Sequence, residues 1–301
     1  MTTKNLHKPI KQFLVLIVFV SLVSGFIWSI SDNGSGRRFE RTNVEHALIS
    51  PTWWSNDGTV AILGTDQLGR DLLSRCIVGG AISISVGLFA ACIAVFLGTA
   101  WGTIAGIYGG RVDTTMMRVV DVLYGFPSIM LVVLITLAVN GVLSSSLISP
   151  VVQEIVNVVA LLIAIGVVSW LTVSRVIRGQ VRSIIARPEI EACKVIGVGP
   201  IRTFTHHLFP PLLGTIIVYA TLTVPTAILS EAFLSFLGIG IREPLPSWGN
   251  LAADGLSQLN PVHSRWWLLF WPCFCIAITL VTLNWFGQTL KKRMDPRSTT
   301  T

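Results

Sequence analysis

The sequence predicts an all-α, polytopic membrane protein with six transmembrane helices. Of the 301 residues, 52% are hydrophobic and 12% are charged, whereas soluble domains average roughly 25% charged residues. The stretches that contain no Asp, Glu, Lys or Arg include 76–110, 122–153, 155–174 and 266–290. Because about 20 apolar residues suffice for one crossing of the hydrocarbon core, each stretch can hold a membrane span.

The predicted organisation runs in five parts from the N-terminus. They are a cytoplasmic N-terminus at 1–12, a first transmembrane helix at 13–30, an extracytoplasmic loop at 31–80, a core with five further helices at 81–290, and a cytoplasmic tail at 291–301. The five core spans are expected near 81–104, 123–143, 155–174, 212–235 and 266–286. Lysines before the apolar run at 13–30 also fit a signal peptide, but the length of the run and the spans that follow favour a retained helix.

The distribution of basic residues predicts the orientation. Lys and Arg are concentrated in the segments that six spans place beside the termini, above all 175–211 and 291–301, and the segment between the third and fourth spans has none. This bias predicts that both termini are cytoplasmic. The net charge of +7 does not predict a nucleic-acid partner, because the basic residues flank apolar stretches and suit a membrane surface.

A glycine stripe marks the second predicted span. Gly98, Gly102, Gly106 and Gly110 recur at four-residue spacing and therefore line one face of a helix. Small residues let another helix approach closely within a membrane. We expect this face to pack inside the subunit, and a subunit interface is the alternative.

The most informative polar segment spans residues 175–211. Pro188 suits the first position of a helix, Glu189 and Glu191 suit its first turn, and Gly197 suits its end. A second short helix is predicted from Pro200 to Leu208, before Pro210 and Pro211 lead into the next span.

Both short helices need a packing partner. Each has about nine residues, fewer than the roughly 12 to 15 at which an isolated helix is marginally stable in water. Apolar residues are available for contact with the base of the membrane domain or with a cytoplasmic partner: Ile190, Val195, Ile196, Ile201 and Phe204.

At this segment the chain resembles the inner-membrane permeases of binding-protein-dependent ABC importers. Glu191-Ala192-Cys193, Gly197 and Pro210 stand at the spacing of the family's loop signature. Cys193, His207 and Phe209 depart from the residues usual in that signature, which bears on how efficiently the loop couples to an ATPase.

A second set of motifs resembles the C-type dipeptide and oligopeptide permeases. It begins before the second span with Gly64, Asp66, Gly69, Arg70 and Asp71, within Gly64–Asp71, and continues at Ser74-Arg75. Further matches follow in the family's order at 109–113, Phe126-Pro127, 230–238, 246–249 and 295–297. The resemblance covers nearly the whole chain from Gly64 onward.

This resemblance implies a type I ABC importer permease in the bacterial inner membrane. Its implied partners are a second, different permease subunit, two ATP-binding subunits and an extracytoplasmic substrate-binding protein. In the family, the loop carrying Pro188, Glu191, Ala192, Gly197 and Pro210 sits in a cleft of the ATPase. We expect no catalytic residue, cofactor or metal on this chain, and no G-x-x-x-x-G-K-[ST] phosphate loop occurs in it.

Several roles stay open at this point. Glu231 could face the translocation pathway or occupy an interfacial structural position, and Phe126 and Pro127 are candidates for pathway or gating. Asp66, Arg70 and Asp71 could form an ion-pair cluster or meet the binding protein. Relatives with this signature also carry antimicrobial peptides, nickel chelates or glycosides. An ion-coupled secondary transporter is the alternative from a different class; it usually needs charged or broken helices near the midplane.

Overall fold

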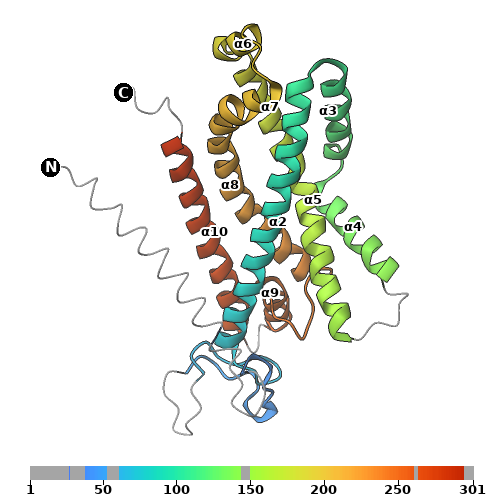
Figure 1. The fold of residues 1–301 in the computed structure, drawn as a ribbon. Helices are drawn as coiled ribbons and strands as arrows, with labels where there is room; N and C mark the ends of the chain where they lie inside the picture. The colour runs from blue at the N-terminus through green and yellow to red at the C-terminus, as the bar shows by residue number, and fades with distance from the viewer. Residues whose placement is uncertain (1–26, 28–37, 53–60, 144–149, 261–263, 295–301) are drawn as a thin grey trace, which may run out of the picture. The chain divides into compact units, whose positions relative to one another are not determined.

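The computed structural model describes residue 27 and residues 38–52, 61–143, 150–260 and 264–294 (Figure 1). These residues form two short 3-10 helices, Arg38–Glu40 and Val44–His46, followed by helices joined by turns. The helices are α2 (Leu72–Tyr108), α3 (Gly110–Tyr124), α4 (Ser128–Leu143), α5 (Pro150–Ile185), α6 (Pro188–Val195), α7 (Pro200–Thr203), a π-helical turn (Phe204–Leu208), α8 (Phe209–Phe236), α9 (Trp248–Ser257) and α10 (Trp267–Met294). The predicted first transmembrane helix at 13–30 lies outside the described residues except for Ile27.

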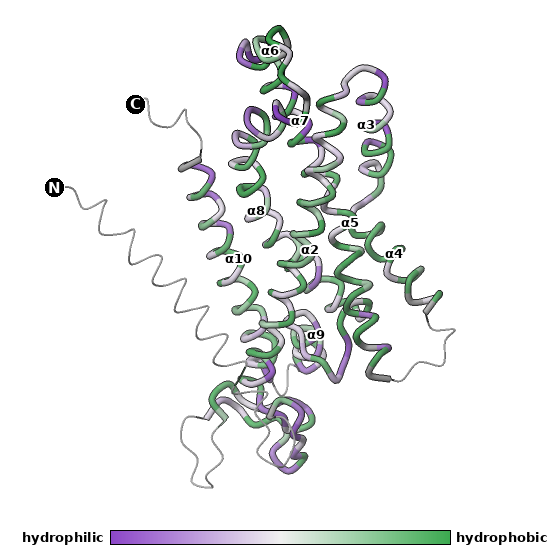
Figure 2. Tube along the Cα trace, in the orientation of Figure 1, coloured by the Kyte–Doolittle hydropathy of each residue, from purple (hydrophilic) through white to green (hydrophobic). Residues whose placement is uncertain are grey.

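Four described helices are long and apolar enough to cross a membrane: Leu72–Tyr108, Ile155–Ile185, Ile201–Phe236 and Trp267–Lys292. They contain the spans predicted near 81–104, 155–174 and 212–235, and nearly all of the one near 266–286. Figure 2 shows hydrophobic residues along most of α2 and α4, and hydrophilic residues at the C-terminal end of α10. The described part of the chain therefore confirms a multi-spanning, all-α membrane protein.

The span predicted near 123–143 is broken. Neither Gly110–Tyr124 nor Ser128–Val139 is by itself long enough to cross a membrane. Taken together they are long and apolar enough, but they meet at an angle of 89°. Pro127 explains the break, because a proline disfavours helical geometry at the residue before it, here Phe126. The 16 residues of α4 make a helix of about 24 Å, shorter than the roughly 30 Å hydrocarbon core.

Helices α2 and α5 extend furthest beyond their predicted spans, and α10 runs to Met294, into the segment predicted as the tail. The 37 residues of α2 measure about 55 Å and the 36 residues of α5 about 54 Å. Residues 72–80, predicted as loop, thus belong to α2, and residues 175–185 of the polar segment belong to α5. Charged side chains end the apolar stretch but not the helix, because the backbone hydrogen bonds between residues i and i−4 do not require apolar side chains.

The chain divides into two compact units: residues 1–85 with 231–282, and residues 86–230 with 283–301. In the second unit, the glycine stripe of α2 lies against α5, since an added Cβ at Gly98 would stand 2.6 Å from the Cβ of Val173 and one at Gly106 would stand 2.7 Å from the Cβ of Val181. The expected packing inside the subunit is therefore confirmed for this face, except at Gly110, where a Cβ would meet nothing within 4 Å.

The first unit is organised around the start of α9. Ser247 caps this helix by accepting a hydrogen bond from the Asn250 N–H, and the Asn250 side chain accepts one from the Ser247 N–H. Trp248 is 2% exposed, and its indole Nε1 donates to the Cys76 carbonyl at 2.9 Å. An apolar cluster made of Leu72, Cys76, Leu251, Trp267 and Leu268 joins α2, α9 and α10 in this unit.

Candidate functional site

The segment Pro188–Leu208, here called the helical bend, has the predicted helix and glycine turn. Helix α6 begins at Pro188 and ends before Gly197, whose φ of +79° lies in the left-handed region that favours glycine. The Val198 N–H donates to the Cys193 carbonyl at 2.9 Å, the six-to-one bond of a Schellman cap. The sequence signals at both ends of α6 are therefore confirmed.

The second helix does not end where predicted. Helix α7, the π-helical turn and α8 form one continuous helical segment from Pro200 through Pro210 and Pro211 to Phe236. Proline removes the N–H that an α-helix needs. The wider π turn, in which the Phe209 N–H donates to the Phe204 carbonyl, comes directly before the two prolines and accommodates them.

The helical bend has one anchored and one exposed apolar face. Ile190 is 2% exposed and Leu208 is 3% exposed. Both belong to a cluster with residues of α5 and α8: Val173, Ile177, Val181, Ile184 and Leu212. In contrast, Val195, Ile196 and Ile201 are 84%, 79% and 80% exposed, and we call these three side chains the exposed trio. Glu191 and Ala192 of the loop signature are exposed as well.

An ion-pair clamp fastens α3 to α5 beside the helical bend. Asp113 is 3% exposed and accepts hydrogen bonds from Arg178 Nε at 2.7 Å and from Arg182 Nη1 at 3.1 Å. A second, more exposed pair joins Arg175 Nη2 to Asp121 Oδ1 at 2.8 Å. Sequence reasoning found the motif around Asp113 and the basic run in α5 separately but did not pair them. The spacing of Arg175, Arg178 and Arg182, which places them on one helix face, was the available signal.

In the first unit, the Gly64–Asp71 motif builds a compact set of ion pairs. Asp66 accepts from the backbone N–H groups of Leu68 at 2.9 Å and Arg70 at 2.8 Å, and from Arg70 Nε at 2.6 Å. Arg75, 1% exposed, also donates to Asp66, and both arginines donate to Glu243 Oε1, at 2.6 Å from Arg70 and 2.9 Å from Arg75. We call Asp66, Arg70, Arg75 and Glu243 the Asp66 network.

The electrostatics of the Asp66 network favour the charged forms. Burial disfavours ionisation of Glu243, but the hydrogen bonds from Arg70 and Arg75 outweigh it and lower the pKa of this carboxyl. Burial likewise opposes the charge of Arg70, yet its bonds to Glu243 and Asp66 leave its pKa raised. Glu243 lies far from the motif in sequence, and the sequence offered no signal for its role.

Asp71, for which an ion-pair cluster and a contact with the binding protein were both open, does not take part in the Asp66 network. Its carboxylate instead accepts the backbone N–H of Ser74 at 3.0 Å and the hydroxyl of the same residue, which caps the start of α2. The motif's glycines allow the backbone conformation of the loop that brings these groups together. Gly64 has φ +91° and Gly69 has φ +71°, and a Cβ on Gly69 would run into the Asn43 carbonyl.

Glu231 lies at the end of α8 within the first unit. Its side chain is 0% exposed, and Oε1 accepts a hydrogen bond from the Ser235 hydroxyl at 2.8 Å. The hydroxyls of Ser83 and Ser247 lie beside the same carboxyl. Its other oxygen, Oε2, is buried without a hydrogen-bond partner among the described residues. Phe126 and Pro127, in contrast, are exposed at the bend between α3 and α4.

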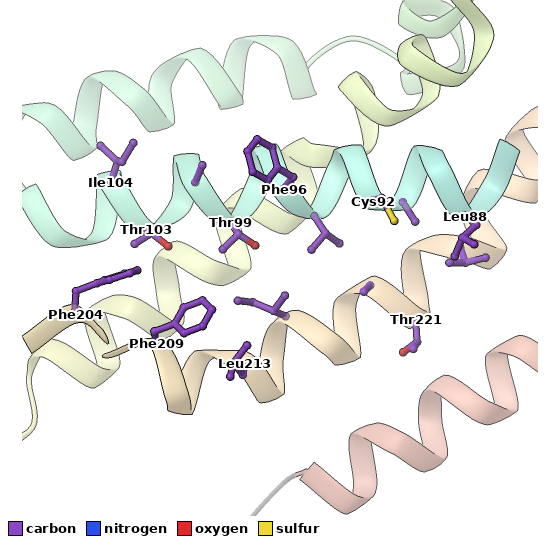
Figure 3. Close-up of a pocket in the computed structure, with 16 residues that line it drawn as sticks. Leu88, Cys92, Phe96, Thr99, Thr103, Ile104, Phe204, Phe209, Leu213 and Thr221 are labelled. Atoms are coloured by element: carbon purple, nitrogen blue, oxygen red, sulfur yellow. The ribbon is translucent and has the colours of Figure 1, made fainter. Parts of the chain in front are cut away.

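An apolar groove of about 770 Å³ runs along α2 in the second unit. Figure 3 shows its walls: Leu88, Phe96 and Ile104 from α2, with Phe204 from the π turn and Phe209 and Leu213 from α8. Apart from Cys92, the polar groups in the lining are the hydroxyls of Thr99, Thr103 and Thr221. A groove of this chemistry suits acyl chains or another membrane helix rather than a polar cargo.

Comparison with protein families defines the class. Residues 98–300 match the family described as "Binding-protein-dependent transport system inner membrane component". The chain belongs to this family.

Individual relatives narrow the family to its peptide-transport branch. The chain is 39% identical to the dipeptide transport system permease protein DppC of Bacillus subtilis, over 78% of this chain and 68% of the relative. It is 39% identical to the oligopeptide transport system permease protein OppC of Bacillus subtilis, over 94% of this chain and 84% of the relative. With OppC of Escherichia coli strain K12 the identity is 41%, over 78% and 72%. Among the inner membrane components, it is therefore a permease subunit of the C-type found in dipeptide and oligopeptide systems.

Solved structures agree on the fold. The MetNI methionine ABC transporter in an inward-facing conformation matches with a TM-score of 0.55 at 15% identity, over 72% of this chain and 94% of that chain. An amino acid ABC transporter matches with a TM-score of 0.51 at 15% identity, over 73% and 94%.

Proposed function

We propose that this chain is one of two different permease subunits of an ATP-driven importer for dipeptides or oligopeptides. The helical bend is the contact for an ATP-binding subunit, both termini are cytoplasmic, and a binding protein delivers cargo to the opposite side. ATP hydrolysis takes place on the separate subunits. The peptide cargo follows from the names of the dipeptide and oligopeptide relatives.

The exposed trio carries the proposal. Its members flank the Gly197 turn, with Val195 and Ile196 at the end of α6 and Ile201 in α7, and exposed large apolar side chains in a polar segment are typical of a protein contact. The other face of the same bend packs on α5 through Ile190 and Leu208. The same cluster includes Leu212 at the start of α8. A force applied to α6 by a closing ATPase pair therefore reaches two membrane spans through a packed core rather than through a flexible linker.

The clamp at Asp113 extends this path. Arg178 and Arg182 lie on α5 directly before the helical bend, and their carboxylate partner lies on α3. Motion of the end of α5 is thereby transmitted to α3 and to the bend at Phe126 and Pro127. We propose that Phe126 and Pro127 act as a hinge of the gate, and that Glu231 holds the far end of α8 rather than contacting cargo.

Co-purification tests the ATPase contact. Affinity-tagged chain, co-expressed with the partner genes and extracted in mild detergent, is expected to retain two ATP-binding subunits. Glu191→Lys and Ile196→Asp are each expected to reduce retention about tenfold or more, since both alter the exposed surface at a contact. Glu189→Lys is the matched control, because Glu189 shares the first turn of α6 and the same helix-dipole effect.

Equal losses in Glu191→Lys and Glu189→Lys, together with an equal fall in the thermal midpoint of both variants, would trace the effect to the stability of α6 and contradict the contact. A wild-type chain that purifies alone and accumulates solute in liposomes under an ion gradient would overturn the importer in favour of a secondary transporter.

Sidedness is tested with an impermeant maleimide on a single cysteine at position 195, which is expected to react only after the cell membrane is opened. ATP-dependent uptake of dialanine and tetraalanine by vesicles, compared with a nickel chelate, tests the cargo.

A further inference from the structure

A small cavity of about 170 Å³ lies beside the Asp66 network in the first unit. The Gly64–Asp71 motif, the start of α2, the loop after α8, α9 and α10 all contribute to its lining. Three carboxylates (Asp66, Glu243 and Asp254) and two guanidinium groups (Arg70 and Arg75) share it with four leucines: Leu68, Leu72, Leu251 and Leu268. It is a narrow site with aliphatic walls in which acidic groups outnumber basic ones by one.

The charges around this cavity do not balance. Asp66 and Glu243 are paired with Arg70 and Arg75 through the contacts of the Asp66 network. The Asp254 carboxylate forms no ion pair or hydrogen bond with any residue that the structure describes; the Ser257 hydroxyl bonds only to its backbone carbonyl. One negative charge is therefore left over in the lining.

Asp254 occupies this position at an electrostatic cost. Burial raises the pKa of Asp254 and the negative charge of Glu243 raises it further, while the nearby positive charges of Arg75 and Arg70 offset only part of this rise. A neutral residue at this position in α9 would avoid both effects and keep the same packing. A carboxylate that the fold does not use for its own pairing is suited to a cation from outside the chain.

The shape of the cavity limits the kind of cation. Pockets for whole small ligands usually measure about 300 to 1,000 Å³, so this volume suits a single side chain rather than a peptide. Lys and Arg combine an aliphatic stem, which lies well along apolar walls, with a charged head. The leucines and the Asp254 carboxylate match these two parts.

We infer that this cavity receives a Lys or Arg side chain of the extracytoplasmic binding protein and so fixes where that protein docks. The inference rests on the proposed function, which supplies the partner and places this unit's loops on the extracytoplasmic side. Asp254 supplies the unpaired charge, and the rigid Asp66 network holds the rim in shape.

The test uses the assembled transporter in nanodiscs and its purified binding protein, with affinity measured by biolayer interferometry at two salt concentrations. Asp254→Asn is expected to weaken docking about tenfold or more and to reduce its salt dependence. The thermal midpoint of the complex should stay unchanged or rise, because the substitution removes an unpaired charge. Glu45→Gln, an exposed acid in the same unit, should dock like the wild type.

A charge swap gives the positive form of the test. Asp254→Lys should abolish docking, and replacing one Lys or Arg on the binding protein by Glu should restore it. Docking of Asp254→Asn at wild-type affinity would overturn the inference while leaving the proposed function intact. Weaker docking together with a lower thermal midpoint would assign Asp254 a structural role and also overturn it. A binding protein that does not bind even the wild-type complex would instead refute the proposed function.

Discussion

The Asp66 network and the helical bend are both built on motifs of the family, yet the side chains of the first pair with one another and those of the second stay largely exposed. In the Asp66 network, two arginines and two carboxylates pair with one another, and Arg75 is 1% exposed. In the helical bend, the side chains of the exposed trio are at least 79% exposed and lie outside the apolar cluster on α5. A motif whose side chains pair with one another stabilises the fold, whereas a motif whose apolar side chains stay exposed is available to bind another protein.

The largest expected effect on stability comes from a substitution in the Asp66 network. Arg75→Met removes a buried cation and leaves Asp66 and Glu243 with only Arg70. Breaking a buried pair in this way typically costs about 3 to 5 kcal/mol, so we expect this loss in the free energy of unfolding and poor recovery of folded protein. Thermal unfolding in detergent, followed by size-exclusion chromatography, measures it. Arg265→Met, which loses the bond to Gln258 at 2.7 Å, is the control, and similar midpoints for the two variants would contradict the network's role.

Ile190 and Ile196 separate the two faces of the helical bend. Ile190→Ala creates a cavity in the cluster on α5 and is expected to cost about 2 to 4 kcal/mol. Ile196→Ala removes an exposed side chain and should leave the thermal midpoint nearly unchanged while weakening retention of the ATPase. Each variant is measured for both properties. If Ile196→Ala lowered the midpoint as much as Ile190→Ala, the exposed trio would be part of the chain's own core.

The clamp between α3 and α5 should give an intermediate effect. Asp113→Asn removes the negative charge that two arginines contact and is expected to cost about 1 to 2 kcal/mol, at the low end for a charged hydrogen bond because Arg182 is 54% exposed. We also expect slower ATP-dependent uptake, since motion of α5 reaches α3 less directly. Wild-type uptake in a variant of reduced stability would confine the clamp to a structural role.

The smallest effect is expected at Arg175. Its side chain is 39% exposed and that of Asp121 is 61% exposed, although the guanidinium also lies 4.0 Å from the centre of the Tyr124 ring. Exposed pairs contribute about 0 to 1 kcal/mol. Arg175→Ala should therefore shift the thermal midpoint by no more than a few degrees. A shift as large as that of Asp113→Asn would indicate that the clamp includes this outer pair.

Local chemistry in the sequence predicted the elements well. Runs without charge located the spans, and Pro188 and Gly197 marked the ends of α6 because proline and glycine restrict or permit particular backbone angles wherever they occur. The bend before α4 could have been predicted in the same way, from the proline of Phe126-Pro127. The prolines at 210 and 211 led to a wrong helix end, because a π turn compensates for their missing N–H donors.

The sequence by itself determined that the chain is a multi-spanning helical permease with a short helix and a glycine turn, because hydropathy, backbone preference and motif spacing are properties of neighbouring residues. Only the tertiary structure decided how Glu243 joins Arg70 and Arg75, how Asp113 meets Arg178, which apolar residues of the bend are covered, and that Asp254 forms no ion pair within the described part of the chain. These facts depend on side chains far apart in the chain. Their pairing is selected by packing geometry, which no local pattern records.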